Sequence, residues 1–441
     1  MSETGLEESL KPIPSDKRTS TYTKYTLTFA SDLIALYSFM MGAAAIAAGL
    51  NMFQAFVAMF IGLGIDVVLL VLNGLPGFRL GIPMVVQMRP CFGSSSAKLT
   101  GIIRAIPAIA WLGFNSWLGA LGLNIFSIIL FGYSNIWLWF IVFQLAQIVL
   151  SALGVKKIFD FNTYAAIVLF TLILVMAGYI FYQYGFSPSQ ELTRAGTWGA
   201  PFLLTITAYV SVGIAVVVNS SDYLRAIKND SVPKLVLAET LGLVPAMVIL
   251  SFLGMMSVSV TGVWSPIDLF VKYVPSFLLI FVAMIFIILG QISTNMFANI
   301  IPANYVWMDI FKMPWWLATI VSGAIGFLIV PWYLTTSSGF FQFMNLYGAL
   351  MGPISGIMIT DWLFIRKQSY QMEALYGETN EYRYWKGINP AGILALIIGT
   401  AVGLWNMNIS SISGLVVGGL AYWALYKFWV AGKFTREEVI K

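Results

Sequence analysis

The sequence predicts an all-α membrane protein of about twelve transmembrane helices, and three observations support that fold class. The chain of 441 residues is 59% hydrophobic and 10% charged, whereas soluble domains carry about 25% charged residues. Its apolar runs approach the length of ~20 residues that a helix needs to cross a bilayer. These runs lack a sustained alternation of period two, so strands are not predicted.

The apolar segments define the predicted spans and leave only short polar loops between them. They lie at residues 27–49, 52–74, 102–131, 135–153, 162–184, 199–220, 235–260, 275–301, 315–334, 339–364, 388–407 and 411–430. Residues 1–26 and 431–441 are predicted tails, and we expect no cleavable signal peptide because the first 24 residues contain no apolar run.

The positions of the basic residues predict that both tails are cytoplasmic. With that orientation, only Arg194 and Lys272 of the 24 Lys and Arg residues fall in outer loops. This bias satisfies the positive-inside rule and favours twelve spans over eleven or thirteen. We therefore expect a multi-pass protein of the cell membrane. The net charge of +5 reflects this topology rather than nucleic-acid binding.

The sequence lacks the residue clusters that catalysis needs. It contains no histidine, and its one cysteine, Cys91, excludes an internal disulfide. No Walker motif or His/Cys/Asp cluster is present. We therefore predict that the protein is not an enzyme.

Two spans contain runs of small residues that could mark unwound segments. Transporters bind cargo where helices break near the middle of the membrane. The first span contains Met41–Gly49 and the sixth contains Tyr209–Gly213, and these spans would correspond in two five-helix halves. The alternative is that small residues only permit close helix packing.

The eighth span carries a polar face that suits a cation. Gly290, Ser293 and Thr294 fall on one side of the helix. Two hydroxyls beside a glycine carbonyl resemble the oxygen ligands that hard cations prefer. Interhelical hydrogen bonding is the simpler alternative.

A second polar row suits a neutral polar substrate. Gln291, Asn295 and Asn299 follow one another at four-residue intervals, and their amides offer both donors and acceptors. On the third span, Trp111 and Asn115 are neighbours on one face. An indole beside an amide can stack on a planar heterocycle and bond its edge.

Carboxylates inside the membrane are rare and commonly functional. Asp66 lies well within the second span, where it could couple protons or pair with a buried polar group. Asp32, Glu239 and Asp361 lie nearer the predicted helix ends, so we expect water to reach them.

Several segments, in order and spacing, resemble those of one transporter family. They are Ile46–Gly49, Trp111–Leu121, Ile214–Val218, Asn219–Arg225, Ser293–Asn295 with Ala298 and Asn299, Gly352–Asp361 and Tyr384–Asn389. The chain resembles the nucleobase–cation–symport-1 transporters, and most of all their hydantoin permease branch. The resemblance implies a leucine-transporter fold with inverted repeats at 27–184 and 199–364 and peripheral helices at 388–430.

The resemblance also implies two sites. A sodium site would use the carbonyls of Tyr37, Met40 and Gly290 and the hydroxyls of Ser293 and Thr294. The substrate pocket would comprise Trp111, Asn115, Ser211, Gly213, Gln291, Asn295, Asn299 and Met41. Hydantoin permeases resembling this chain have a second stacking Trp in place of Gly213, and Gln in place of both Asn115 and Met41.

We therefore expect a monomeric secondary active symporter working by alternating access. It would import a nucleobase or related planar N-heterocycle of the hydantoin, cytosine, uracil or allantoin class, coupled to sodium. Two alternatives remain: a proton-coupled permease that uses Asp66, and a channel or substrate sensor built on a transporter scaffold.

Overall fold

The computed structural model describes residues 10–184, 192–228, 231–273, 276–329, 336–377 and 379–431, and the regular structure in these ranges is helical. The predicted tails therefore lie partly outside the described residues. In chain order the main helices are α2 (Tyr22–Leu33), α3 (Leu36–Ala47), α4 (Met52–Leu80), α5 (Met84–Phe92), α6 (Ser96–Phe131), α7 (Ile136–Ala152), α8 (Val155–Tyr184), α10 (Ala200–Val218), α11 (Ser220–Leu224), α12 (Val232–Thr261), α13 (Pro266–Tyr273), α14 (Phe277–Thr294), α15 (Ile301–Phe311), α16 (Trp315–Gly326), α17 (Ser337–Thr360), α18 (Met372–Leu375), α19 (Pro390–Trp405) and α20 (Ser410–Leu425). Short π-helical segments continue three of them, namely η2 (Asn295–Ile300), η4 (Asp361–Ile365) and η6 (Tyr426–Val430).

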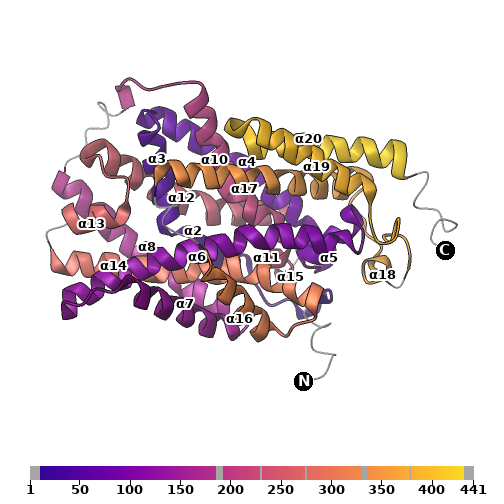
Figure 1. Cartoon of the computed structure of the whole chain (residues 1–441), viewed down its shortest axis with the longest axis horizontal. Helices are drawn as coiled ribbons and strands as arrows, with labels where there is room; N and C mark the ends of the chain where they lie inside the picture. The colour runs from indigo at the N-terminus through magenta and orange to yellow at the C-terminus, as the bar shows by residue number, and fades with distance from the viewer. Residues whose placement is uncertain are drawn as a thin grey trace.

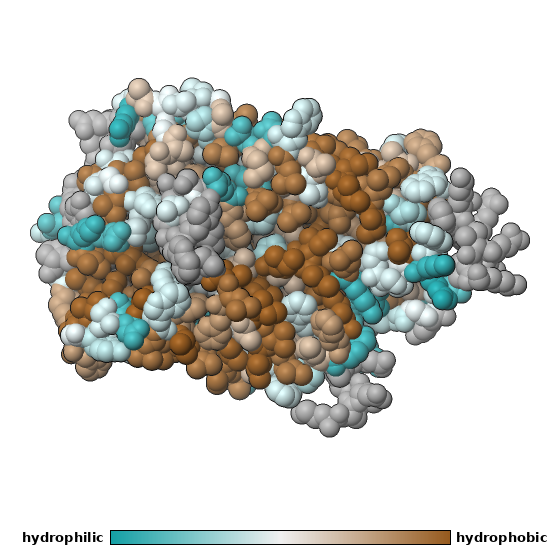
Figure 2. Space-filling model, in the orientation of Figure 1, coloured by the Kyte–Doolittle hydropathy of each residue, from teal (hydrophilic) through white to brown (hydrophobic). Residues whose placement is uncertain are grey.

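The predicted all-helical membrane architecture is confirmed. Within the described ranges, eight helices are long and apolar enough to cross a membrane, and the bent pair α2–α3 makes a ninth. The helices α7, α16 and α19 are apolar but shorter. Figure 2 shows hydrophobic residues over the middle of the visible face and hydrophilic residues gathered toward its two ends. Such a broad exposed apolar surface suits contact with lipid.

Three sets of helix contacts organise the fold. α3 packs on α12, and α4 on α10. α6 runs across the molecule and contacts α7, α14 and α15. The last two long helices, α19 and α20, pack on α17 and lie beside it in Figure 1.

The first span breaks earlier in the chain than the small residues suggested. α2 and α3 meet at 55°, and the two residues between them are Ile34 and Ala35. Met41–Ala47 belongs to the regular helix α3, and α10 continues without a break through Tyr209–Gly213. The prediction that these small-residue runs are unwound is therefore wrong.

Close packing accounts for part of the small-residue run in the first span. A Cβ on Gly42 would lie 1.8 Å from the Ser251 carbonyl oxygen, and one on Gly254 would lie 1.9 Å from the Phe39 carbonyl oxygen. α3 and α12 thus approach backbone to backbone. Packing at such a crossing is a main source of helix association in lipid.

We expect Gly42→Ala to lower the thermal unfolding midpoint of the purified protein in detergent. Overpacking costs ~1–3 kcal/mol, which exceeds the ~1 kcal/mol that alanine gains in helix propensity. Gly64→Ala is the matched control, since a Cβ there meets nothing within 4 Å. Equal midpoints for the two variants would contradict the tight crossing.

Candidate substrate and cation site

The site begins at the break in the first span. The ψ angles of Ile34 and Ala35 are 68° and 165°, so both residues leave the helical conformation. A break frees backbone carbonyls that can coordinate ions. The Leu33 carbonyl is occupied, because it accepts a hydrogen bond from Ser38 Oγ at 2.6 Å.

The eighth span faces this break with the residues that its sequence predicted. The Ser293 hydroxyl bonds the Ser31 hydroxyl, and the Thr294 hydroxyl donates to the Asp32 carbonyl. A Cβ on Gly290 would lie 2.7 Å from the Ile34 carbonyl oxygen. At Gly290, helix α14 thus lies directly against the backbone of the break.

The predicted carbonyls of the first span lie farther along the chain. Tyr37 and Met40 belong to the regular helix α3, beyond the break. Tyr37 contributes through its side chain instead: its hydroxyl donates to the Asp32 carbonyl at 3.4 Å, and it lines the cavity described below. The break precedes both residues, whereas we expected it at Met41–Gly49.

Asp32 is a candidate site residue that sequence reasoning missed. Its side chain is fully buried, and neither carboxylate oxygen has a hydrogen-bond partner among the described residues. We expected water at Asp32 because the span was predicted to begin at residue 27. The helix begins at Tyr22, and the break after Leu33 carries Asp32 into the protein interior. An acidic residue in an apolar span was the available signal.

A small cavity joins the two polar faces. Its volume is about 30 Å³, and its lining residues are Asp32, Tyr37, Trp111, Asn115, Val212, Ala215, Val216, Thr294, Ala298 and Asn299. That volume is close to the share of a single water molecule in the liquid. The cavity is thus much smaller than a typical small-molecule site of about 300–1,000 Å³.

Aromatic side chains from two other helices, α3 and α17, surround Trp111. Its ring centroid lies 5.3 Å from that of Tyr37, 5.5 Å from Phe343 and 6.3 Å from Phe340 and Tyr347. Three of these partners belong to α17, and sequence reasoning named none of them. Edge-to-face contacts of this kind fix an indole firmly.

The amide row of the eighth span packs against α6. Asn299 Nδ2 donates to Asn295 Oδ1 at 2.8 Å, and Asn295 Nδ2 donates to the Leu112 carbonyl at 3.2 Å. Gln291 Nε2 reaches Asn115 Oδ1 at 3.5 Å, and Asn115 Nδ2 has no partner among the described residues. Asn115 and Asn299 line the cavity, while Gln291 and Asn295 lie behind them.

The remaining predicted pocket residues turn away from the cavity. Ser211 faces α17, since a Cβ on Gly348 would lie 2.3 Å from its Oγ. Gly213 faces α4, since a Cβ there would lie 2.1 Å from Asp66 Cγ. Met41 is fully buried in the core and is not a lining residue. α10 instead presents Val212, Ala215 and Val216.

Asp66 is a second buried carboxylate. It is 1% exposed, and neither oxygen has a hydrogen-bond partner in the described ranges. It lies against Gly213 and is not among the residues that line the cavity. The side chain of Asp66 thus occupies space that any larger residue at 213 would need.

A polar network closes the end of the site near α11. Arg104 donates to Asn219 Oδ1 from Nε at 2.9 Å and from Nη2 at 2.6 Å. The Tyr223 ring stacks on Phe297 at 4.0 Å and thereby holds α11 on η2. The motif 219–225 therefore anchors the end of α10 to α6 and to the eighth span.

Asp222 joins the same network to the start of α5. Its Oδ1 accepts a hydrogen bond from the Met84 amide at 2.7 Å. Burial raises the pKa of Asp222 to about 7, although that amide and the charges of Arg225 and Arg104 oppose the rise.

The oxygen atoms at the break suit a hard cation. The described set comprises a carboxylate, two hydroxyls and backbone carbonyls, with no nitrogen or sulfur ligand. Within the described ranges there is no group of three or more His, Cys, Asp or Glu that could hold a metal ion of the transition series.

Known proteins resemble this chain over most of its length. A family model described as "Permease for cytosine/purines, uracil, thiamine, allantoin" matches residues 12–431. The hydantoin permease of Microbacterium maritypicum is 29% identical over 399 residues, covering 87% of this chain and 81% of the permease. The allantoin permease of Bacillus subtilis (strain 168) is 24% identical over 446 residues, covering 92% of this chain and 88% of that protein.

Solved structures agree with these relatives. The nucleobase-cation-symport-1 family transporter Mhp1, in a closed conformation with bromovinylhydantoin bound, has a TM-score of 0.89 at 27% identity and covers 98% of this chain and 97% of its own. A Na+-coupled sialic acid symporter shares the fold alone, with a TM-score of 0.64 at 13% identity. This chain is therefore a multi-pass membrane transporter and not an enzyme, and it belongs to the nucleobase–cation–symport-1 family of permeases for cytosine/purines, uracil, thiamine and allantoin.

Proposed function

We propose that the protein is a sodium-coupled symporter that imports a neutral planar N-heterocycle of the hydantoin, allantoin and nucleobase class. The observation that carries this proposal is the buried carboxylate of Asp32, which lines one cavity together with Thr294 and Trp111. The names of the relatives, hydantoin permease and allantoin permease, support the substrate class.

The charge of the cavity supports one bound cation. Among the described residues that line it, Asp32 is the only ionisable acid or base apart from the Tyr37 phenol. A buried carboxylate without a partner is costly, and a cation at the break would compensate it. Sodium bound there would supply the positive charge, and Ser293 and Thr294 would hold it together with the backbone of the break. A neutral cargo then leaves the cavity electrically balanced.

Trp111 and two amides suit recognition of a ring. The indole offers an apolar face, and Asn115 and Asn299 offer donors and acceptors at the cavity wall. Because Asn115 Nδ2 has no partner among the described residues, it is free to donate to a ring carbonyl. Gln291 and Asn295 position these two amides from behind.

The small cavity supports transport by alternating access. A volume of about 30 Å³ requires the helices to part on one side before cargo enters and on the other before it leaves. The family favours this function over a channel or sensor. The proton-coupled alternative rests on Asp66, whose carboxylate lies beside Gly213 and outside the cavity lining.

The topology is part of the proposal. If the shorter helices α7, α16 and α19 also cross the membrane, the total is twelve spans, arranged as two inverted repeats of five and two peripheral helices. Both termini then lie in the cytoplasm and the protein in the plasma membrane, as the basic residues predict. We propose a monomer as the transporting unit.

Uptake into proteoliposomes tests the coupling. We expect labelled hydantoin or allantoin to accumulate only with an inward sodium gradient. Thr294→Val should reduce this uptake roughly tenfold or more, because a hydrogen-bonding contact with a charged group is worth ~1.5–3 kcal/mol. Thr171→Val is the control, since within the described part of the chain the Thr171 hydroxyl bonds only Ile167 O of its own helix, at 2.9 Å.

Uptake that is undiminished without sodium would defeat the coupling proposal. A pH gradient then separates the alternatives, because proton coupling through Asp66 predicts that Asp66→Asn abolishes accumulation. Saturation and accumulation against a gradient would exclude a channel.

Sodium binding alone tests the role of Asp32. We expect sodium to raise the thermal unfolding midpoint of the purified protein by mass action. Asp32→Asn should remove most of this rise while preserving side-chain shape. The exposed Asp268→Asn serves as the control. A full sodium response in Asp32→Asn would show that the carboxylate compensates something other than sodium.

Ligand binding tests the ring site. We expect Trp111→Ala to weaken binding of the best heterocycle in a thermal-shift screen roughly tenfold, since stacking of a base on an aromatic ring is worth ~1–3 kcal/mol. Trp405→Ala is the matched control, because that side chain is 88% exposed. Unchanged affinity in Trp111→Ala would remove the indole from the pocket.

A further inference from the structure

A second cavity lies apart from the transport site, where α5, the start of α6 and the end of α15 meet the segment between α17 and α19. Its volume is about 380 Å³, which is within the range of small-molecule sites. Its lining residues are Arg89, Ser94, Ser95, Lys98, Asp309, Lys312, Ala374, Leu375, Tyr376, Gly377, Thr379, Asn380, Tyr382 and Arg383. In Figure 1 α5 and α18 mark this end of the molecule.

The described lining carries four basic side chains and one acid. Arg89 and Asp309 satisfy each other, with Nη2 and Oδ1 at 2.8 Å, and Arg89 Nη1 also donates to the Leu375 carbonyl at 2.6 Å. Lys98, Lys312 and Arg383 form no ion pair within the part of the chain that the structure describes. A concave surface lined by uncompensated positive charge concentrates anions.

Side chains, rather than the end of a helix, would bind the anion. The first amides of α6 are already used, since the Ser95 and Ser96 amides both donate to the Gly387 carbonyl and the Ala97 amide donates to Gly93 O. The available donors are the three cationic side chains together with the hydroxyls and amide of the lining, namely Ser94, Ser95, Thr379 and Asn380.

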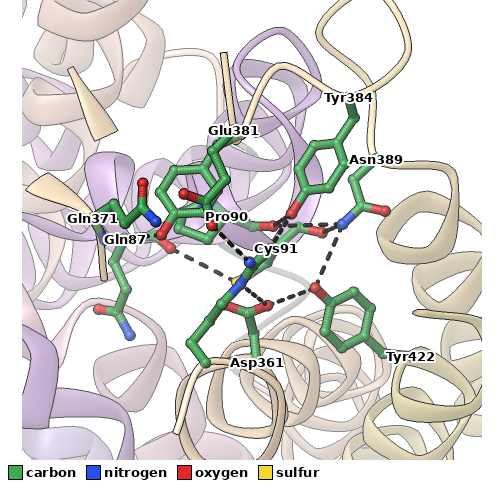
Figure 3. A network of polar contacts seen from close by, with 11 residues as sticks. Gln87, Pro90, Cys91, Asp361, Gln371, Glu381, Tyr384, Asn389 and Tyr422 are labelled. Atoms are coloured by element: carbon green, nitrogen blue, oxygen red, sulfur yellow. Dashed lines mark hydrogen bonds and ion pairs between the residues drawn. The ribbon is translucent and has the colours of Figure 1, made fainter. Parts of the chain in front are cut away.

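The wall that carries Arg383 is held in place by its own polar network. The Arg366 guanidinium lies over the Tyr382 ring at 4.9 Å, and the Tyr384 hydroxyl donates to the Pro90 carbonyl at 2.6 Å. Figure 3 shows Tyr384 and Asn389 directed at the Pro90–Cys91 backbone, with Asp361 and Tyr422 completing the network. The chain on both sides of Arg383 is thus fixed before any ligand binds, which reduces the entropic cost of binding.

We propose that this cavity binds an oxyanion, the phosphate group of an anionic lipid or of a free phosphate compound, through Lys98, Lys312 and Arg383. The three cations come from three segments: the first turn of α6, the residue after α15 and the segment between α17 and α19. A phosphate bound among them links those segments. α6 and the eighth span also form walls of the transport cavity, so the bound phosphate would connect segments that lead to that cavity.

The test uses the full chain in nanodiscs and two separate sources of phosphate. In one arm the lipid is neutral phosphatidylcholine and inorganic pyrophosphate is titrated. In the other arm phosphatidylglycerol replaces part of the lipid and no free phosphate is present. We expect a rise in the thermal unfolding midpoint in at least one arm. A response to pyrophosphate alone identifies a soluble anion, and a response to phosphatidylglycerol alone identifies a lipid headgroup.

Matched charge variants assign the effect to the cavity. The double variant Lys98→Gln and Lys312→Gln should weaken the response roughly tenfold or more, because charge-assisted hydrogen bonds are the strong ones. The double variant Lys156→Gln and Lys157→Gln removes the same charge from exposed positions on α8 and should leave it unchanged. If the first variant fails to fold, Arg383→Gln replaces it. No response in either arm, or equal weakening by both double variants, would overturn the proposal.

Discussion

A hydrocarbon layer tolerates neither unbonded backbone groups nor an uncompensated charge, and the break at Ile34–Ala35 concentrates both in one place. The freed backbone and the carboxylate of Asp32 require partners that the first span cannot supply. α14 supplies hydroxyls, and α8 steadies α14, because Asn162 Nδ2 donates to the Ser293 carbonyl at 3.1 Å. The interruption in the first span is thus contacted by α14, which α8 contacts in turn.

The hydroxyls of Ser293 and Thr294 and the amides of Gln291, Asn295 and Asn299 all belong to the eighth span. This span therefore connects the oxygen atoms at the break with the amides at the cavity. Thr294 and Asn299 both line the cavity, and the π-helical segment between Asn295 and Ile300 changes the facing of the residues that follow Thr294. π-helical turns are uncommon and concentrate at functional sites. Under the proposed function, a cation that orders α14 at the break also orders the amides that read the ring. Cation binding and substrate recognition would then be coupled directly through the eighth span.

Sequence patterns predicted what depends on local periodicity and missed what depends on contacts between distant segments. The spacing of Ser293 and Thr294 on a helix was sufficient to predict a polar face, and apolar length was sufficient to predict membrane helices. The run at Met41–Gly49 led to a wrong position for the break, because small residues permit close helix packing as well as unwinding. Gly42 is an example, since it lies against the backbone of Ser251. The burial of Asp32 was not predicted, because the first helix begins at Tyr22 and not at residue 27. Phe343 reaches Trp111 only through the fold of α17 onto α6.

The exchange at Gly213 shows how one substitution redirects a site. Hydantoin permeases resembling this chain have a stacking tryptophan there, whereas here a Cβ alone would lie 2.1 Å from Asp66 Cγ. Glycine therefore makes room for a carboxylate on α4, and α10 can offer only aliphatic side chains to the cavity. The aromatic neighbours of Trp111 come instead from α3 and α17, and most meet it edge-on. Under the proposed function, a ring bound on Trp111 would therefore meet the aliphatic side chains of α10, while the aromatic side chains of α17 would act on it through their contacts with the indole.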